Sequence, residues 1–123
     1  MVEVRAVAYD RRKLVGMIDE LLSADPRMPL PKIARELGVE RHTIEKAVRH
    51  VRRMSFREHR QEKLLERALF LLNDKRGFTE KEVAAELGFA SLEAFIRFIK
   101  AQTGTTPKEI RNRPSHTTLD SES

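Results

Sequence analysis

An internal repeat dominates this sequence. Residues 33–39 read Ile-Ala-Arg-Glu-Leu-Gly-Val, and residues 83–89, fifty positions later, read Val-Ala-Ala-Glu-Leu-Gly-Phe. In both copies the glycine is followed by a few polar residues and then by a new amphipathic segment. The small alanine lets two helices cross closely, so each copy predicts a helix-turn-helix unit. The alternative is a pair of solenoid repeats, but a solenoid needs about three repeats to be stable and the chain offers two.

The spacing of apolar residues is helical along nearly the whole chain, which predicts an all-α fold of about seven helices. Asp10 and the Thr79/Glu82 pair are expected to begin helices, and Gly38 and Gly88 are expected to end them. We expect the helices to lie at about residues 10–23, 31–37, 41–53, 62–72, 79–87, 91–102 and 107–113. The predicted organisation is an arm or linker (1–10), a first helix-turn-helix unit (11–61), a linker helix (62–72), a second unit (73–113) and a disordered tail (114–123).

Charge is distributed very unevenly over the 123 residues. The net charge is +5, and the segment between Arg41 and Arg60, with seven basic and two acidic residues, accounts for all of this surplus. The other 103 residues carry 17 charges of each sign. A local basic stripe on a neutral body indicates a polyanionic partner.

The second helix of each copy carries the candidate binding residues. In the first copy the face opposite the apolar residues presents long cationic or hydrogen-bonding side chains, and such side chains can reach G O6/N7 or phosphate from a helix in the major groove. The candidates in the first copy are Arg41, His42, Glu45, Lys46, Arg49 and Arg53. In the second copy the equivalent positions, shifted by one residue because the turn is longer, are Leu92, Glu93, Arg97 and Lys100.

Other classes of protein are disfavoured by what the sequence lacks. Without cysteine there can be no disulfide framework, zinc ribbon or thiol nucleophile, and the histidines have no metal-ligand spacing. No enzyme motif stands out, so we expect neither catalysis nor a cofactor. The first ten residues lack the apolar core of a secretory signal and no apolar run could span a bilayer, so we expect a soluble cytoplasmic protein without a membrane partner.

At the level of whole motifs, the sequence resembles the DNA-binding domain of the AraC/XylS transcriptional regulators. The resemblance covers about residues 11–113. It rests on Val83-Ala84, Gly88-Phe89, Phe95, Arg97, Lys100, Gly104, Pro107 and Arg111 in the second copy and on Ile33-Ala34, Gly38, Ile44, Lys46, Val48, Arg49 and Ser55 in the first. Between the copies, Lys63-Leu64, Glu66-Arg67-Ala68 and Leu71-Leu72 resemble the linker helix of that family. Arg53 and Phe56 stand where the family usually has Gly and Pro, which predicts that the first recognition helix runs on or docks differently.

The resemblance implies a transcriptional regulator that binds double-stranded DNA, either a stand-alone member of the MarA type or a piece cut at a domain linker. Two tandem units on one chain predict a monomer that reads two successive major grooves of a non-palindromic site. For a regulator of this family, RNA polymerase is a further partner to expect. The alternative is a divergent protein-interaction module without specific DNA readout, which Glu93 and the irregular 53–56 stretch favour. RNA binding ranks third, because the phenylalanines have the spacing of core residues.

Overall fold

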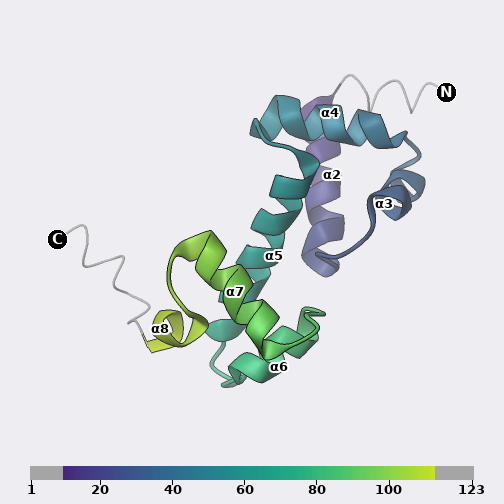
Figure 1. The fold of residues 1–123 in the computed structure, drawn as a ribbon. Helices are drawn as coiled ribbons and strands as arrows, with labels where there is room; N and C mark the ends of the chain where they lie inside the picture. Colours follow the sequence, from purple (N-terminus) through teal and green to yellow (C-terminus); the bar gives the residue numbers. More distant parts are fainter. Residues whose placement is uncertain (1–9, 113–123) are drawn as a thin grey trace. The chain divides into compact units, whose positions relative to one another are not determined.

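The computed structural model describes residues 10–112, and in that part of the chain it contains seven helices and no strand (Figure 1). The predicted all-α class is therefore confirmed. The helices are α2 (Arg11–Ala24), α3 (Leu30–Leu37), α4 (Arg41–Arg52), α5 (Phe56–Leu72), α6 (Glu80–Glu86), α7 (Leu92–Thr103) and α8 (Pro107–Asn112). The predicted tail and residues 1–9 of the predicted arm lie outside the described residues. The chain divides into two compact units, and the division falls within α5, between Leu64 and Leu65.

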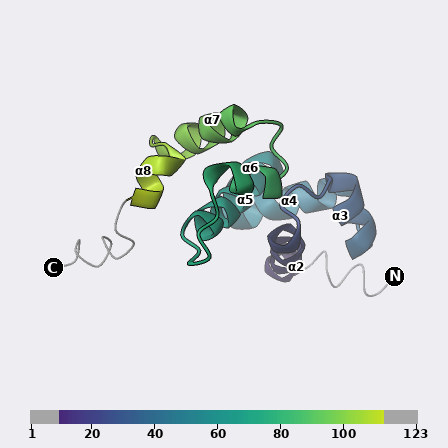
Figure 2. The same cartoon turned by 90° about the horizontal axis from the view of Figure 1, so that it is seen from below.

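The core of the first unit is built from the apolar faces of α2, α3 and α4, closed by Phe56 at the start of α5. Figure 2 views α2 nearly end-on, with α4 running across it. The buried residues of this core are Leu14, Val15, Ile18, Leu22, Met28, Ile33, Ala34, Ile44, Ala47, Val48 and Phe56. Because the buried residues of α4 share one side of the helix, its opposite side is left to solvent.

The two repeated turns have the same hydrogen-bond pattern. Val39 N donates to Ala34 O at 3.1 Å, and Phe89 N donates to Ala84 O at 2.9 Å, the long bond of a Schellman motif. Gly38 and Gly88 supply the left-handed backbone that this motif requires, with φ of 69° and 81°. Three residues lie between Gly88 and the first residue of α7, as against two between Gly38 and the first residue of α4, so the longer second turn predicted from the sequence is confirmed.

The connection between α4 and α5 differs from the expectation. α4 ends at Arg52 and does not run on, because Arg53 adopts a left-handed conformation (φ 61°) and its N–H caps Arg49 O. α5 then begins at Phe56, six residues before the predicted start near Glu62. A reciprocal pair of bonds explains the early start: Ser55 N donates to the Glu58 carboxylate, and Glu58 N donates to Ser55 Oγ.

The second unit repeats the helix-turn-helix with stronger capping. Thr79 and Glu82 form the predicted capping box at α6, and Ser91 Oγ accepts from Ala94 N at the start of α7. Phe95 is fully buried, and the Phe89 ring centroid lies 5.3 Å from those of Phe95 and Phe98. These aromatic rings therefore pack against one another in the second unit, as their helical spacing predicted.

None of the helices between residues 10 and 112 is both long enough and apolar enough to cross a membrane.

Candidate nucleic-acid interface

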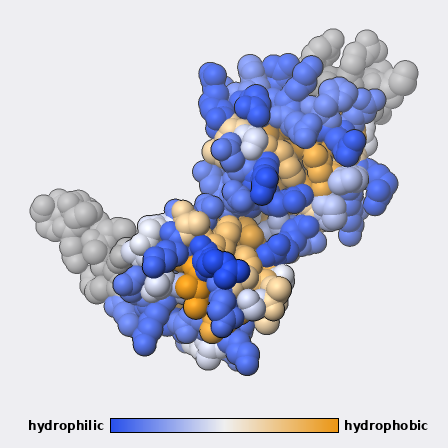
Figure 3. All heavy atoms as spheres, in the orientation of Figure 1, coloured by the Kyte–Doolittle hydropathy of each residue, from blue (hydrophilic) through white to orange (hydrophobic). Residues whose placement is uncertain are grey.

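The solvent side of α4 gathers most of the first unit's predicted site residues. Arg41, His42, Glu45, Lys46 and Arg49 are all exposed there, while Ile44, Ala47 and Val48 are buried on the other side. α4 lies at the top of Figure 1, and the same region of Figure 3 is almost entirely hydrophilic. The outer face of α4 is thus a strip of cationic side chains with a single carboxylate, that of Glu45.

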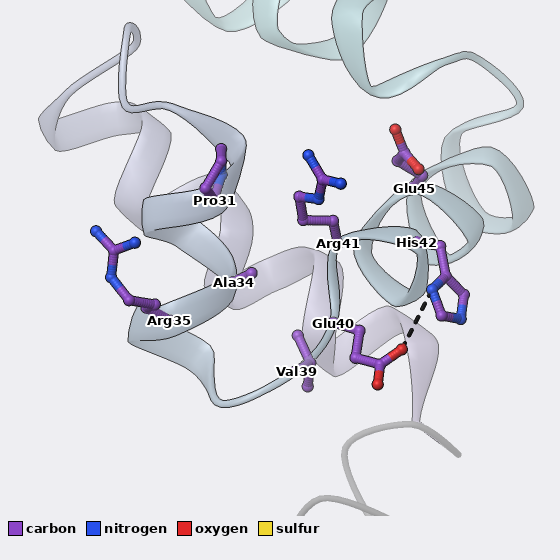
Figure 4. Close-up of a pocket in the computed structure, with 8 residues that line it drawn as sticks. All are labelled: Pro31, Ala34, Arg35, Val39, Glu40, Arg41, His42 and Glu45. Carbon is purple, nitrogen blue, oxygen red and sulfur yellow. Dashed lines mark ion pairs between the residues drawn. The ribbon is translucent and has the colours of Figure 1, made fainter.

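The N-terminal end of α4 carries an ion pair that the sequence did not predict. His42 Nδ1 lies 3.3 Å from Glu40 Oε1, and both side chains remain exposed. Figure 4 shows this pair beside Arg41, whose side chain extends into the space between α3 and α4. In the same view Arg35 points away from α4. A ligand at this end of α4 would therefore meet Arg41 directly, and His42 only together with its carboxylate neighbour.

The C-terminal end of α4 separates Arg53 from the other predicted site residues. Arg53 is exposed, but it lies beyond the helix, in the left-handed residue that ends it. The sequence-based placement of Arg53 on the outer face of α4 is therefore wrong, because Arg53 belongs to the turn that follows the helix. The left-handed conformation is strained for a residue with a side chain, and glycine adopts it without that cost.

Two cations of the basic segment, Arg52 and Arg60, make hydrogen bonds within the first unit. Arg52 Nη2 donates to Asp19 Oδ2 at 2.7 Å, which joins the end of α4 to α2. Arg60 Nη2 donates to Met28 O at 2.8 Å, and its guanidinium carbon lies 5.0 Å from the centroid of the Phe56 ring. Burial lowers the pKa of Arg60. Of the seven basic residues between 41 and 60, these two are therefore not offered to a ligand in the way that Lys46 and Arg49 are.

A carboxylate of α2 fixes the orientation of α4. Asp19 contacts Arg52, the buried His59 at 2.5 Å and Lys63 at 3.9 Å, and so joins α2 to the end of α4 and the first half of α5. Burial alone would raise the pKa of Asp19, but the hydrogen bonds from His59 and Arg52 hold it below its ordinary value of 3.8. The carboxylate is therefore ionised at neutral pH and helps to hold α4 in place.

Two basic residues near α4 were not assigned to the site from the sequence. Arg11, at the start of α2, lines a hollow with His42 and Lys46, and Arg57, in the first turn of α5, lines another with Lys46 and Arg49. For Arg57, the only sequence feature that pointed to the interface was its place in the basic segment. No sequence feature pointed to Arg11, because its closeness to α4 depends on how α2 and α4 pack.

The second unit presents a weaker version of the same face. Glu93, Arg97 and Lys100 are exposed on α7, whereas Leu92 is half-buried. The outer face of α7 thus combines two cations with one carboxylate near its N-terminus. Within residues 10–112 no group of three or more His, Asp or Glu side chains is arranged to hold a metal ion.

Comparisons with known proteins agree with this geometry. The family model described as "Helix-turn-helix domain" matches residues 33–113. A DNA-binding transcriptional dual regulator from Escherichia coli K-12 is 27% identical with a TM-score of 0.69, and the match covers 79% of this chain and 87% of that one. A probable AraC family transcriptional regulator from Rhodopseudomonas palustris is 25% identical with a TM-score of 0.62, covering 93% and 100%.

A third solved structure shares the fold at lower identity. The DNA-binding domain of AdpA, solved in complex with a target DNA, is 18% identical with a TM-score of 0.66, and the match covers 92% of this chain and 97% of that one. A comparison with curated proteins gives no significant match.

Proposed function

The chain belongs to the AraC-type helix-turn-helix family of DNA-binding domains, and from this premise we propose that it reads two successive major grooves of duplex DNA with α4 and α7. The family and fold are those of DNA-binding transcriptional regulators, which are not enzymes. The observation that carries the proposal is the outer face of α4, where Lys46 and Arg49 are exposed side by side. An α-helix fits the major groove, and from it such side chains reach guanine O6 and N7 or phosphate oxygens.

The two units have different roles in this proposal. α4 supplies most of the base reading and anchoring, through His42, Lys46 and Arg49 with Arg41 at its start. α7 adds mainly backbone contacts through Arg97 and Lys100, because the carboxylate of Glu93 repels phosphate unless it accepts a hydrogen bond from a cytosine amino group. Arg53, in the turn after α4, is suited to a phosphate oxygen more than to a base edge.

The tandem arrangement also bears on the form of the binding site. Two non-identical units on one chain favour a monomer on an asymmetric site, whereas a two-fold dimer favours a palindrome. The units would contact half-sites about 10 base pairs apart, one helical turn of DNA. A regulator of this kind acts on the chromosome in the cytoplasm, with RNA polymerase as its partner.

Selection of bound sites from a random duplex pool tests this proposal. We expect enrichment of a non-palindromic site with two conserved blocks one helical turn apart, the stronger of which is lost when Lys46 is replaced by Ala. Recovery of a palindrome, or of one block only, would overturn the proposal that the two units occupy successive major grooves. A pool that shows no enrichment would overturn specific DNA recognition altogether.

The second candidate function is a protein-interaction module that has lost specific DNA readout. The exposed Glu93 on α7 favours it. The 53–56 stretch does not, because Arg53 caps the end of α4 there and Ser55 caps the start of α5. A salt titration against random duplex separates the two functions. DNA binding through several phosphates gives a steep fall of log K with log salt, and a pure protein module gives almost none.

A further inference from the structure

Two hollows flank the outer ridge of α4, which we define by His42 and Lys46. Both residues line both hollows, so the hollows lie on either side of the ridge. The α2-side hollow also contains Arg11, together with Thr43 and Ala47 of α4. The α5-side hollow also contains Arg57, together with Glu45 and Arg49 of α4. Each side of the outer ridge of α4 is thus bordered by an arginine from a different helix.

Both arginines are available to a ligand. Arg11 and Arg57 are exposed, and neither forms an ion pair with another residue of the described range 10–112. This sets them apart from Arg52 and Arg60, which are engaged by Asp19 and by Met28 O. A guanidinium stays charged at any physiological pH and matches the geometry of phosphate oxygens.

We propose that Arg11 and Arg57 bind phosphate groups on opposite strands of the duplex, as a two-sided clamp around α4. This clamp rests on the proposed function, in which α4 lies in the major groove. A helix in that groove has one sugar-phosphate backbone on each side, and so cations on its two flanks face different strands. The clamp sets the depth and tilt of α4 while Lys46 and Arg49 read bases. Its contacts carry no sequence information of their own.

The clamp predicts a defined change in salt dependence. Each phosphate contact releases a counterion, so losing one lowers the slope of log K against log salt by about 0.9 and weakens binding about tenfold near 0.1 M salt. Arg11→Ala and Arg57→Ala should each produce this change. The loss should be equal on the selected site and on an unrelated duplex, because phosphate is present in both.

The matched control is Arg12→Ala. Arg12 is the exposed neighbour of Arg11 on α2 and lines neither hollow, so it removes the same charge with no expected loss of a contact. Thermal unfolding followed by circular dichroism verifies that all three variants are folded. Binding is measured by fluorescence anisotropy with full-length protein over a range of salt concentrations.

The assignment to opposite strands is tested with duplexes that carry single methylphosphonate linkages, which are uncharged. With wild-type protein, neutral linkages beside the first half-site should weaken binding on both strands. Arg11→Ala should abolish this sensitivity on one strand and Arg57→Ala on the other. If both variants affect the same strand, or if both keep the wild-type slope and sensitivity, the clamp is overturned while DNA binding stands. If the wild type binds no duplex, the proposed function itself has failed.

Discussion

His59 Nε2 lies 2.5 Å from Asp19 Oδ1, which pairs a buried histidine of α5 with a carboxylate of α2 forty residues earlier in the chain. The other oxygen of the same carboxylate accepts a hydrogen bond from Arg52, the last residue of α4. One side chain thereby ties together three helices of the first unit, including the one proposed to enter the groove. His59 Nδ1 has no hydrogen-bond partner among the described residues, so Asp19 is the polar contact on which this buried ring depends.

Replacing Asp19 should therefore destabilise the first unit. Asp19→Asn keeps the shape but removes the charge and turns one of the two acceptor oxygens into an N–H donor, so that Arg52 and His59 can no longer both donate to this side chain. We expect the free energy of unfolding to fall by about 2 kcal/mol, measured by urea denaturation. Glu20→Gln, at the exposed neighbouring position of α2, is the control and should change it by less than about 0.5 kcal/mol. Equal effects of the two substitutions would show that Asp19 contributes no more than a surface carboxylate.

The same pair predicts a pH dependence of known sign. Because the pKa of Asp19 is lowered in the folded protein, its ionised form stabilises the fold above the ordinary pKa of 3.8, and this contribution is lost as the pH falls from there through the folded pKa. The groups that face the carboxylate are Arg52, His59 and Lys63. The difference in unfolding free energy between wild type and Asp19→Asn should thus shrink as the pH falls below 3.8. A difference that persists unchanged into strong acid would contradict the role of the charge.

Arg53 provides a prediction in which stability and binding move in opposite directions. Arg53→Gly relieves a left-handed residue and should raise the free energy of unfolding by up to about 1 kcal/mol. The same change removes a cation next to α4 and should weaken DNA binding with a shallower salt slope. Thermal melts and anisotropy titrations measure the two effects. Arg49→Gly is the contrasting control, since glycine inside α4 should lower stability by about 1 kcal/mol. Stability and affinity that rise together would refute a binding role for Arg53.

The base-reading role of α4 is tested by Lys46→Ala and Arg49→Ala. Each should cost about 1 to 3 kcal/mol on the selected site where it contacts a base, and less, with a reduced salt slope, where it contacts only phosphate. The matched control is Lys32→Ala with Arg12→Ala, which removes two exposed charges from α3 and α2. Unchanged affinity and slope in the double variant of Lys46 and Arg49 would exclude α4 as the binding helix.

The repeat was sufficient to predict the helices and both turns, because their determinants are local. An alanine, a glycine and the apolar spacing around them specify each Schellman turn, and the Thr79/Glu82 box lies within four residues. Those signals require no knowledge of the tertiary structure.

The contacts that hold α4 could not be predicted in this way. Asp19 and His59 are forty residues apart, and a single histidine in a basic segment gives no sign of its partner. Arg57 and Arg52 are equally basic in sequence, and only the packing decides that Arg52 is used within the fold while Arg57 remains exposed. The end of α4 has no recognisable sequence signal, because arginine seldom adopts the left-handed conformation that glycine adopts easily.

The asymmetry between the two units leads to a gain-of-function prediction. Glu93 occupies on α7 the position of His42 on α4, and its exposed carboxylate faces the proposed groove. Glu93→Lys should therefore tighten binding to any duplex and steepen the salt slope by about 0.9, because a phosphate contact replaces a repulsion. The control is Glu86→Lys, which makes the same change of charge at an exposed position of α6 and not on α7. If the two variants tighten binding equally, net charge alone is responsible, and α7 does not approach the DNA backbone as proposed.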